Sequence, residues 1–360
     1  MSLKKIAMMT GASVSTVSRV LGSPDYHCSD PELEQKIREA AQEIQYLPNR
    51  AARSLRRQEE QSEETLTADI FLARFASLDS DLFFRELYNC IQAELRLQNC
   101  LAGEILQAED VSMLQSVHHG GHVPYRTAQK QQEEQRVRGN AAVPTKEGCG
   151  LLILGKCPEK TAAILKQRYR FLVGIDRNPT DYLYDEVVCD GAAAAQKAVE
   201  YLISLGHREI IYIGDCTYES RYIGYYQALL AHRMPLNYSD VFPTGQTEEE
   251  GYRVMQQLLE SGRRPEAVFC ANDSTAFGVL EALRQKKIRG WRPSVISIDN
   301  TDRAAKSVPA LTAIDMPKKE MAHLAVQLLL DQFHRGHKEH VRLQLPCRLV
   351  VRESTGNIQL

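Results

Sequence analysis

Polar side chains suited to binding a neutral polyol occur in one recurrent position of this chain. Each comes at the end of an apolar run or at the entry of the helix-like segment that follows: Asp176, Arg221, Asn272 and Asp299. Carboxylates accept hydrogen bonds from adjacent hydroxyls, and the Arg fork donates to two oxygens at once. A multiply charged phosphate would need more cations and a Gly-rich phosphate loop, which the sequence lacks. The set therefore indicates a sugar-like ligand.

Two alternatives to ligand binding stand beside this interpretation. Polar residues after strands are often helix caps, and for Asp273 a capping role is as well supported as a ligand contact. Asp176 and Asp299 also resemble the paired carboxylates of a glycosidase. However, the sequence contains no nucleophile elbow, dinucleotide fingerprint, P-loop or zinc-protease motif. We therefore predict that the protein is not an enzyme, with no catalytic residues and no cofactor.

The elements that must position these residues alternate between strand-like and helix-like segments. The strands are expected at 68–73, 150–154, 171–175, 209–213, 267–270 and 294–298, and the helices at 83–97, 192–205 and 274–286. Wholly apolar strands separated by helices are typical of a parallel sheet covered on both faces. The length favours two such α/β subdomains, and ligands of open α/β sheets bind beyond the carboxyl ends of the strands.

A second kind of chemistry is indicated near the N-terminus. Apolar spacing predicts a helix from Leu3 to Met9, Gly11 permits a tight turn, and Ser13 can cap a second helix. A third helix is expected after a cap at Ser29 or Asp30. This is the helix-turn-helix pattern, in which the start of the second helix reads base edges. The exposed face of that helix carries small polar groups and one cation: Val14, Ser15, Thr16, Ser18 and Arg19.

The segment after Pro48 predicts a short helix that forms on DNA. Its capping and basic residues suit contacts with phosphates or the minor groove, and they are Asn49, Arg50, Arg53 and Arg56. Leu55 is an apolar side chain among these cations, which suits a wedge that unstacks a base step. A basic linker is the alternative.

Several motifs together resemble the lactose-repressor/galactose-repressor family of bacterial transcription regulators over nearly the whole chain. They include Ser-Thr-Val-Ser-Arg-Val at 15–20, Tyr-Leu-Pro-Asn-Arg-Ala-Ala-Arg-Ser-Leu at 46–55, Cys-Ala-Asn-Asp at 270–273 and Ser-Ile-Asp-Asn at 297–300. Lys5 and Ala12 depart from the family's common residues. The resemblance implies an N-terminal three-helix helix-turn-helix domain plus hinge helix, then an α/β periplasmic-binding-protein-like core of two parallel-sheet subdomains.

The resemblance also implies residue roles. Val14 and Ser15 would read the major groove with support from Arg19, and Leu55 would be the minor-groove lever. Arg221 and Asp299 would grip the effector, and Asp176 and Asn272 would participate. Phe83 or Phe84 would form an apolar wall for the sugar, and the sequence does not decide which.

The implied function is a homodimeric repressor of sugar-utilisation genes. It would bind a pseudo-palindromic operator and respond to a small sugar, with a galactoside somewhat favoured. A regulator with a phosphorylated protein as co-repressor is one alternative, and a sugar-binding module without regulatory role is another. The chain ends shortly after 354 without a heptad tail, so we expect a dimer rather than a coiled-coil tetramer.

Charge and composition set the domain boundaries. Residues 1–57 hold nine Lys/Arg and six Asp/Glu, although the whole chain has a net charge of −2. We expect a DNA-binding domain at 1–57 with a hinge helix at about 49–56, and a polar linker at 58–67. The first core subdomain is expected at 68–189 and about 315–340, and the second at 190–314 and about 341–360, with crossings placed by the resemblance.

Nine cysteines without a C-x-x-C pair favour reduced thiols over disulfides or zinc. There is no signal peptide and no 18-residue apolar stretch, so we expect a cytoplasmic protein without membrane contact. Residues 101–150 are interpreted as a polar surface insertion. Its three histidines, His118, His119 and His122, lack a nearby carboxylate or Cys at ligand spacing, so no metal site is predicted.

Overall fold

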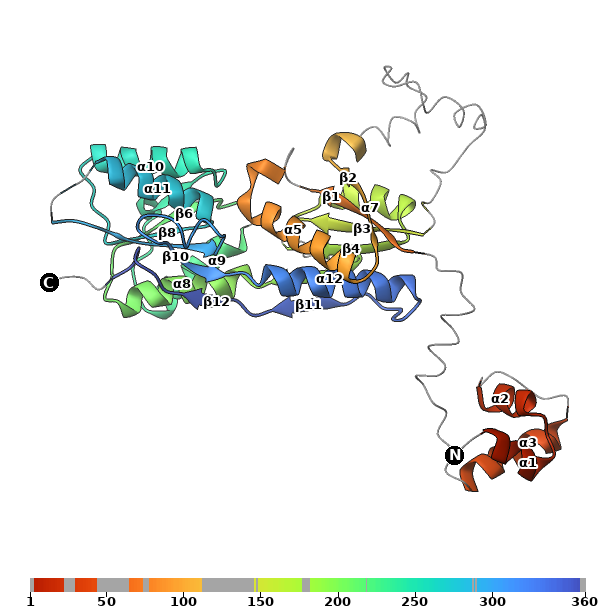
Figure 1. Cartoon of the computed structure of the whole chain (residues 1–360). Helices are drawn as coiled ribbons and strands as arrows, with labels where there is room; N and C mark the ends of the chain where they lie inside the picture. The colour runs from red at the N-terminus through yellow and green to blue at the C-terminus, as the bar shows by residue number, and fades with distance from the viewer. Residues whose placement is uncertain are drawn as a thin grey trace, which may run out of the picture. The chain divides into compact units, whose positions relative to one another are not determined.

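The computed structural model describes residues 3–22, 30–43, 65–73, 78–111, 146, 148–176, 182–217, 219–286, 288 and 290–356. The chain divides into two units, Met1–Glu64 and Thr65–Leu360. Each unit has its own apolar core, and each is described by itself (Figure 1).

The first unit is a bundle of three helices, α1 (Leu3–Thr10), α2 (Val14–Gly22) and α3 (Pro31–Glu43). Gly11 adopts a φ of 70° in the turn between α1 and α2, a conformation that glycine adopts without steric cost. The Oγ of Ser13 accepts from the backbone amide of Thr16 at 3.0 Å, as a helix cap does. Of the two caps expected for the third helix, Asp30 accepts from the amides of Glu32 and Leu33, and Ser29 lies outside the described residues.

The first sheet of the second unit has six parallel strands in the order β11-β5-β4-β3-β1-β2. These strands are β1 (Thr67–Leu72), β2 (Leu101–Leu106), β3 (Cys149–Leu154), β4 (Phe171–Ile175), β5 (Asp185–Cys189) and β11 (Arg342–Leu345). Its helices are α5 (Leu82–Leu97), α7 (Glu159–Arg168) and α12 (Lys318–Phe333), with a 3-10 turn η1 (Leu78–Ser80) before α5. Helix α12 contacts both α5 and β4, so it covers a face of this sheet (Figure 1).

The second sheet has the order β12-β10-β9-β8-β6-β7, and β12 is antiparallel to β10. Its strands are β6 (Ile210–Gly214), β7 (Val241–Pro243), β8 (Ala267–Cys270), β9 (Ser294–Asp299), β10 (Thr312–Asp315) and β12 (Arg348–Val350). Its helices are α8 (Gly191–Ser204), α9 (Ser220–Ala231), α10 (Glu248–Glu260) and α11 (Asp273–Gln285), with a 3-10 turn η3 (Tyr238–Asp240). The predicted three-helix domain and the core of two α/β subdomains are therefore confirmed, and the predicted hinge helix lies outside the described residues.

The α8–α9 contact brings two backbones together. A Cβ atom on Gly224 would lie 2.1 Å from the carbonyl oxygen of Ala192, and one on Gly191 would lie 2.3 Å from the Oγ of Ser220. Only glycine fits at 224, where the neighbouring atom belongs to the main chain, so no side chain separates Ala192 of α8 from α9 at this point.

The chain passes between the two sheets three times, after β5, after β10 and after β11. Two sequence expectations need correction here. Strand β11 pairs with β5 in the first sheet, so the last crossing falls after Leu345 and not at about 340. The expected insertion at 101–150 begins with β2, which forms the edge of the first sheet beside β1.

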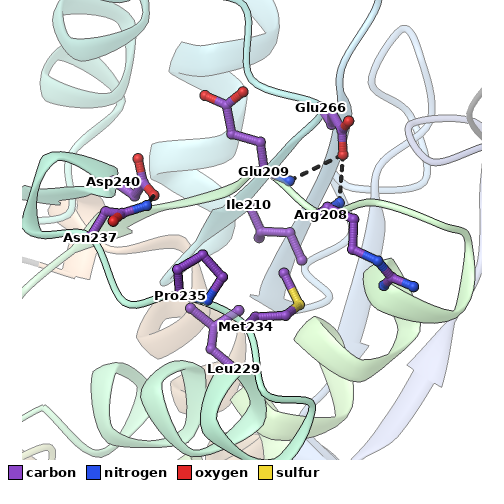
Figure 2. Close-up of a pocket in the computed structure, with 9 residues that line it drawn as sticks. All are labelled: Arg208, Glu209, Ile210, Leu229, Met234, Pro235, Asn237, Asp240 and Glu266. Atoms are coloured by element: carbon purple, nitrogen blue, oxygen red, sulfur yellow. Dashed lines mark hydrogen bonds between the residues drawn. The ribbon is translucent and has the colours of Figure 1, made fainter.

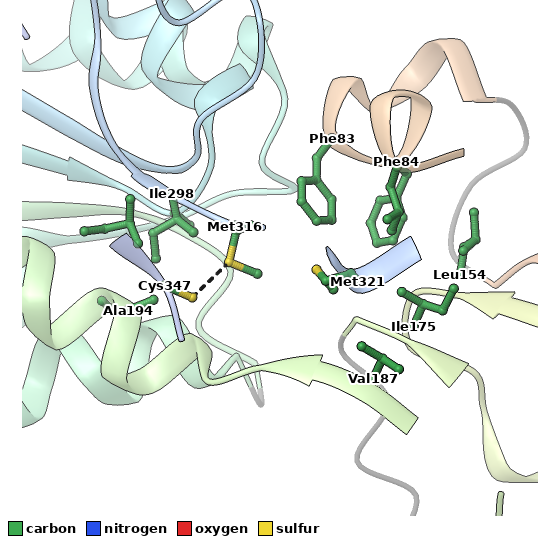
Figure 3. Close-up of a cluster of buried hydrophobic side chains, with 14 of the residues drawn as sticks. Phe83, Phe84, Leu154, Ile175, Val187, Ala194, Ile298, Met316, Met321 and Cys347 are labelled. Carbon is green, nitrogen blue, oxygen red and sulfur yellow. Dashed lines mark hydrogen bonds between the residues drawn. The ribbon is translucent and has the colours of Figure 1, made fainter. Parts of the chain in front are cut away.

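Apolar side chains continue from one sheet to the other across these crossings. Figure 3 shows Phe83, Phe84 and Met321 of the first subdomain on one side, with Ile298 and Met316 on the other. All five belong to one buried cluster. The second unit therefore has a core that continues between its two sheets.

Candidate ligand site and nucleic-acid interface

A buried ion pair joins Arg221 to Asp299. Arg221 lies in the first turn of α9 and is 2% exposed. Its Nη1 donates to the carbonyl oxygen of Ala271 at 2.6 Å, and its Nη2 donates to Oδ1 of Asp299 at 3.2 Å. Glu219, which caps α9, lies 3.9 Å from Nε. The guanidinium thus connects the ends of β8 and β9 to the start of α9.

The pKa of Arg221 is raised in this environment. Burial alone would lower it, but attraction from Asp299, Glu219 and Asp176 outweighs the loss of hydration. Asp176 therefore lies within electrostatic range of Arg221, although the two residues come from different sheets. Three of the four polar residues predicted to bind the effector, Asp176, Arg221 and Asp299, therefore form one electrostatic group.

The residues at the ends of β4 and β9 have an unusual backbone conformation. Asp176 has a φ of 53°, Asp299 a φ of 121° and Asn300 a φ of 51°. Positive φ is uncommon for residues other than glycine, and such conformations concentrate at functional sites. Asp176 and Asp299 are both at most 4% exposed, so their carboxyl groups face the interior and not bulk water.

Lys318 belongs to the same group, although the sequence analysis did not identify it. Its Nζ donates to the carbonyl oxygens of Asp299 and Asn300 at 2.9 and 3.0 Å and lies 5.6 Å from the centre of the Phe83 ring. Glu86 of α5 lies 3.5 Å from the same nitrogen. The sequence feature that could have identified it is a lysine in the first helical turn after Pro317, directly beyond the crossing that follows β10.

The two phenylalanines at the start of α5 take different positions. Their rings pack edge to face with centres 5.1 Å apart. Phe83 has Lys318 over its ring, whereas Phe84 lies on the side of Leu154 and Ile175 in the core (Figure 3). Phe83 is therefore the ring beside the polar group, and Phe84 serves packing.

Asn272 and Asp273 have structural partners. Asn272 caps α11: its Oδ1 accepts from the amide of Thr275 at 2.9 Å, and its Nδ2 donates to the carbonyl of Gln246 at 2.9 Å. Asp273 accepts from the Ser297 hydroxyl at 2.6 Å and from the amide of Thr301 at 2.6 Å. Burial raises the pKa of Asp273, although these hydrogen bonds oppose the shift. The capping alternative is thus observed for Asn272, which was expected to contact the effector.

A separate pocket of about 250 Å³ lies away from these residues. Figure 2 shows it beside Arg208, Glu209 and Ile210, where β6 begins, whereas Arg221 follows the end of that strand. None of the predicted effector residues lines it.

The candidate DNA-contacting residues lie at the start of α2. Val14 is 41% exposed, and Ser15 and Arg19 are also exposed. The hydroxyl of Ser13 lies 2.7 Å from that of Ser15 and 2.8 Å from that of Thr16, which orders this end of the helix. The side chain of Ser18 and the predicted hinge residues Asn49, Arg50, Arg53, Leu55 and Arg56 lie outside the described residues.

Comparison with protein families agrees with this division of the chain. A model of bacterial regulatory proteins of the lacI family matches residues 2–49, and a model of a periplasmic binding protein-like domain matches residues 199–355. The fold and these matches define a transcription regulator with a helix-turn-helix unit and a ligand-binding-type core. The chain therefore carries the DNA-binding domain of the lacI family of bacterial regulatory proteins together with a periplasmic binding protein-like domain.

Curated relatives match over nearly their full length. The chain is 29% identical over 362 residues to the HTH-type transcriptional repressor CytR of Escherichia coli strain K12, covering 98% of this chain and 96% of CytR. It is 26% identical over 372 residues to the repressor PurR of Haemophilus influenzae, covering 99% of both chains. Its relatives are therefore transcriptional repressors.

Solved structures share the fold. A complex of the transcriptional regulator CelR with cellobiose matches with a TM-score of 0.63 and 23% identity, covering 99% of this chain and 100% of CelR. The lac repressor dimer bound to operator and the anti-inducer ONPF matches with a TM-score of 0.63 and 21% identity, covering 99% of each chain.

Among the described residues, no helix is both long and apolar enough to cross a membrane. In that same part of the chain, no group of three or more His, Cys, Asp or Glu side chains is placed to hold a metal ion. The histidines at 118, 119 and 122 lie outside it.

Proposed function

We propose that this protein is a homodimeric, sequence-specific transcriptional repressor that a small sugar controls through its two-sheet core. The observation that carries the proposal is the buried Arg221–Asp299 pair at the strand ends, with Asp176 in electrostatic range. A guanidinium and carboxylates at the carboxyl ends of parallel strands suit a ligand rich in hydroxyl groups.

The arrangement supports a sugar over an anionic ligand. Arg221 is compensated by Asp299 and Glu219, and Lys318 by Glu86 and backbone carbonyls. The group therefore has no excess of cations to neutralise a phosphate. The Phe83 ring beside Lys318 supplies an apolar surface for the C–H face of a sugar ring.

Control of DNA binding requires that the ligand favour one arrangement of the two subdomains. The charged group draws on both sheets, since Asp176 follows β4 and Asp299 ends β9. A sugar held between them would shift the subdomains, and the coupling to DNA is expected at about 1–3 kcal/mol per site. Whether the sugar induces or co-represses remains an outcome of the experiment.

The DNA-binding half of the proposal rests on α2. Val14 and Ser15 at its start would read bases in the major groove, with Arg19 in support. A twofold dimer would place two such helices on matching half-sites, so the operator is expected to be pseudo-palindromic. The relatives are repressors rather than enzymes, and we propose no catalytic activity for this chain and a cytoplasmic location.

The test uses the full chain and two readouts. Selection from fragmented genomic DNA at modest ionic strength should enrich one pseudo-palindromic motif, and no enrichment would contradict the proposal. A thermal-shift screen with galactose, lactose, ribose and cellobiose should then raise the melting temperature with at least one sugar, and the same sugar should change operator affinity. Hydrolysis of chromogenic glycosides would instead support the glycosidase alternative.

A further inference from the structure

Two cysteines and two methionines meet where the chain crosses between the sheets. The sulfur of Cys189 lies 3.8 Å from that of Met321, and the sulfur of Cys347 lies 3.5 Å from that of Met316 (Figure 3 shows the second pair). Each of these two thiols also shifts the pKa of the other, so they lie within interaction range. The two thiols are therefore neighbours, although 158 positions separate Cys189 from Cys347 in the sequence.

Each thiol sits on a different crossing. Cys189 is the last residue of β5, directly before the passage to α8. Cys347 lies between β11 of the first sheet and β12 of the second. Strand β11 pairs with β5 so that Leu345 is opposite Cys189, which brings these two crossings side by side.

The surroundings make the two thiols unequal. Interaction with Cys189 lowers the pKa of Cys347 even though burial opposes this, and the same interaction raises the pKa of Cys189, which burial raises further. Cys347 is 8% exposed, and Cys189 is partly exposed. Cys347 is thus the better nucleophile, and Cys189 is placed to resolve an oxidised Cys347.

We propose that Cys189 and Cys347 form a reversible redox pair that closes to a disulfide between the two crossings, with a peroxide as oxidant. The Cys347 thiolate attacks one peroxide oxygen, the O–O bond breaks, and the leaving hydroxide takes a proton to become water. Cys189 then attacks the sulfur of the resulting sulfenic acid and expels a second water. Two thiols are oxidised by two electrons and one hydrogen peroxide is reduced to two waters.

The location gives the bond a mechanical effect. A disulfide would join two of the three segments that connect the two subdomains. Asp176 and Arg221 both act electrostatically on these thiols, so the bond would form beside the charged group. Oxidation would also weaken the sugar response, and this part of the inference rests on the proposed function. Disulfide formation itself does not depend on the proposed function.

The test maps the bond in the purified full chain without DNA or sugar. Reduced protein is treated with hydrogen peroxide, alkylated and digested with trypsin. Cleavage after Lys or Arg leaves Cys189 in the peptide 178–197 and Cys347 in 343–348, each with a single cysteine. We expect these two peptides to be the main linked pair, to separate with dithiothreitol, and to remain unlinked in Cys189→Ser or Cys347→Ser.

Cys216→Ser is the matched control, because Cys216 is also partly exposed but lies away from the crossings. This variant should form the linked pair as the parent does. In the oxidised parent, amide exchange at the crossing segments should slow by about tenfold, and Cys189→Ser should show no such change. Independent oxidation of the two thiols to sulfinic acids, or linkage to other cysteines at equal yield, would overturn the proposal. Because no operator or sugar enters the assay, its failure is distinct from failure of the proposed function.

Discussion

The carboxylate of Glu86 accepts a hydrogen bond from the backbone amide of Asp302 at 2.8 Å. Glu86 lies on α5 of the first-sheet subdomain, and Asp302 lies in the loop after β9 of the second. The same carboxylate is 3.5 Å from Nζ of Lys318, which binds the carbonyl oxygens at the end of β9. Glu86 therefore connects the two subdomains next to the candidate effector site.

Removing this carboxylate should loosen the contact. In Glu86→Ala, amide exchange at Asp302 is expected to accelerate by about three- to tenfold, because the carboxylate that accepts from this amide is gone. Hydrogen exchange with mass spectrometry measures this directly. Glu94→Ala on the same helix is the control, since Glu94 binds His323 of α12 within one subdomain. Equal exchange in parent and Glu86→Ala would show that the contact does not hold the loop.

Arg221→Ala should abolish the sugar response while DNA binding persists. The variant leaves Asp299 buried without its cation, which is expected to cost about 3–5 kcal/mol of core stability. The helix-turn-helix unit has a separate core and should stay folded. Operator affinity with and without the sugar found in the thermal-shift screen checks the response, and urea unfolding checks the stability. An undiminished response would remove Arg221 from the effector site.

Changes in the predicted DNA contacts should separate specificity from affinity. Val14→Ala or Ser15→Ala should alter base preference within the half-site, at about 1–3 kcal/mol for a lost base contact. Leu55→Ala should weaken operator binding strongly and leave sugar affinity unchanged, because a minor-groove wedge, as we predict for Leu55, would act only on DNA. Selection experiments with each variant give both quantities. An unchanged motif in the Val14 and Ser15 variants would mean that these side chains do not read bases.

Asp69 should govern part of the acid stability of the core. This carboxylate is 1% exposed, lies 2.7 Å from Nζ of Lys146 and accepts from the Tyr169 hydroxyl at 2.6 Å. Burial raises its pKa, but these hydrogen bonds outweigh burial and hold the pKa below the usual value of 3.8. A depressed folded-state pKa stabilises the fold above the unfolded-state value, and this stability is lost as pH falls through the folded-state pKa.

Asp69→Asn should therefore lower the free energy of unfolding at pH 7 by about 1–3 kcal/mol. Its stability should also fall less steeply below pH 4 than that of the parent, because one linked proton is gone. Urea unfolding from pH 7 to pH 3 tests both. If the free energy of unfolding fell equally steeply with pH in parent and variant, Asp69 would not be the linked group.

Apolar strands could be predicted from sequence, and short polar ones could not. The runs 171–175 and 267–270 are strands with those bounds, because burial on both faces leaves a continuous apolar signal. Strand β2 carries five exposed residues at the sheet edge and was interpreted as part of an insertion. Strand β11 has four residues without a fully buried one, so its place in the first sheet appears only from its pairing with β5.

The site shows a similar division. Asp299 ends β9 and Arg221 lies in the first turn of the helix after β6, so their approach could be expected from parallel topology. Lys318 and Glu86 reach the same place from helices that are distant in sequence, and their role depends on how α5 and α12 pack together. For Asn272, the capping and ligand interpretations use the same residue type at the same position, and only its bonds to Thr275 and Gln246 separate them.

The glycine contact between α8 and α9 has a consequence for how strain would travel. Arg221 and Gly224 lie on adjacent turns of α9. Gly224 packs directly against the main chain of Ala192, with no side chain between them. Rigid contacts of this kind transmit displacement instead of absorbing it. A displacement of the Arg221 guanidinium would therefore reach the start of α8 nearly undiminished, at Ala192, which lies three positions after Cys189. Replacing Gly224 with a larger residue would push the two helices apart and change the position of Arg221 relative to the start of α8.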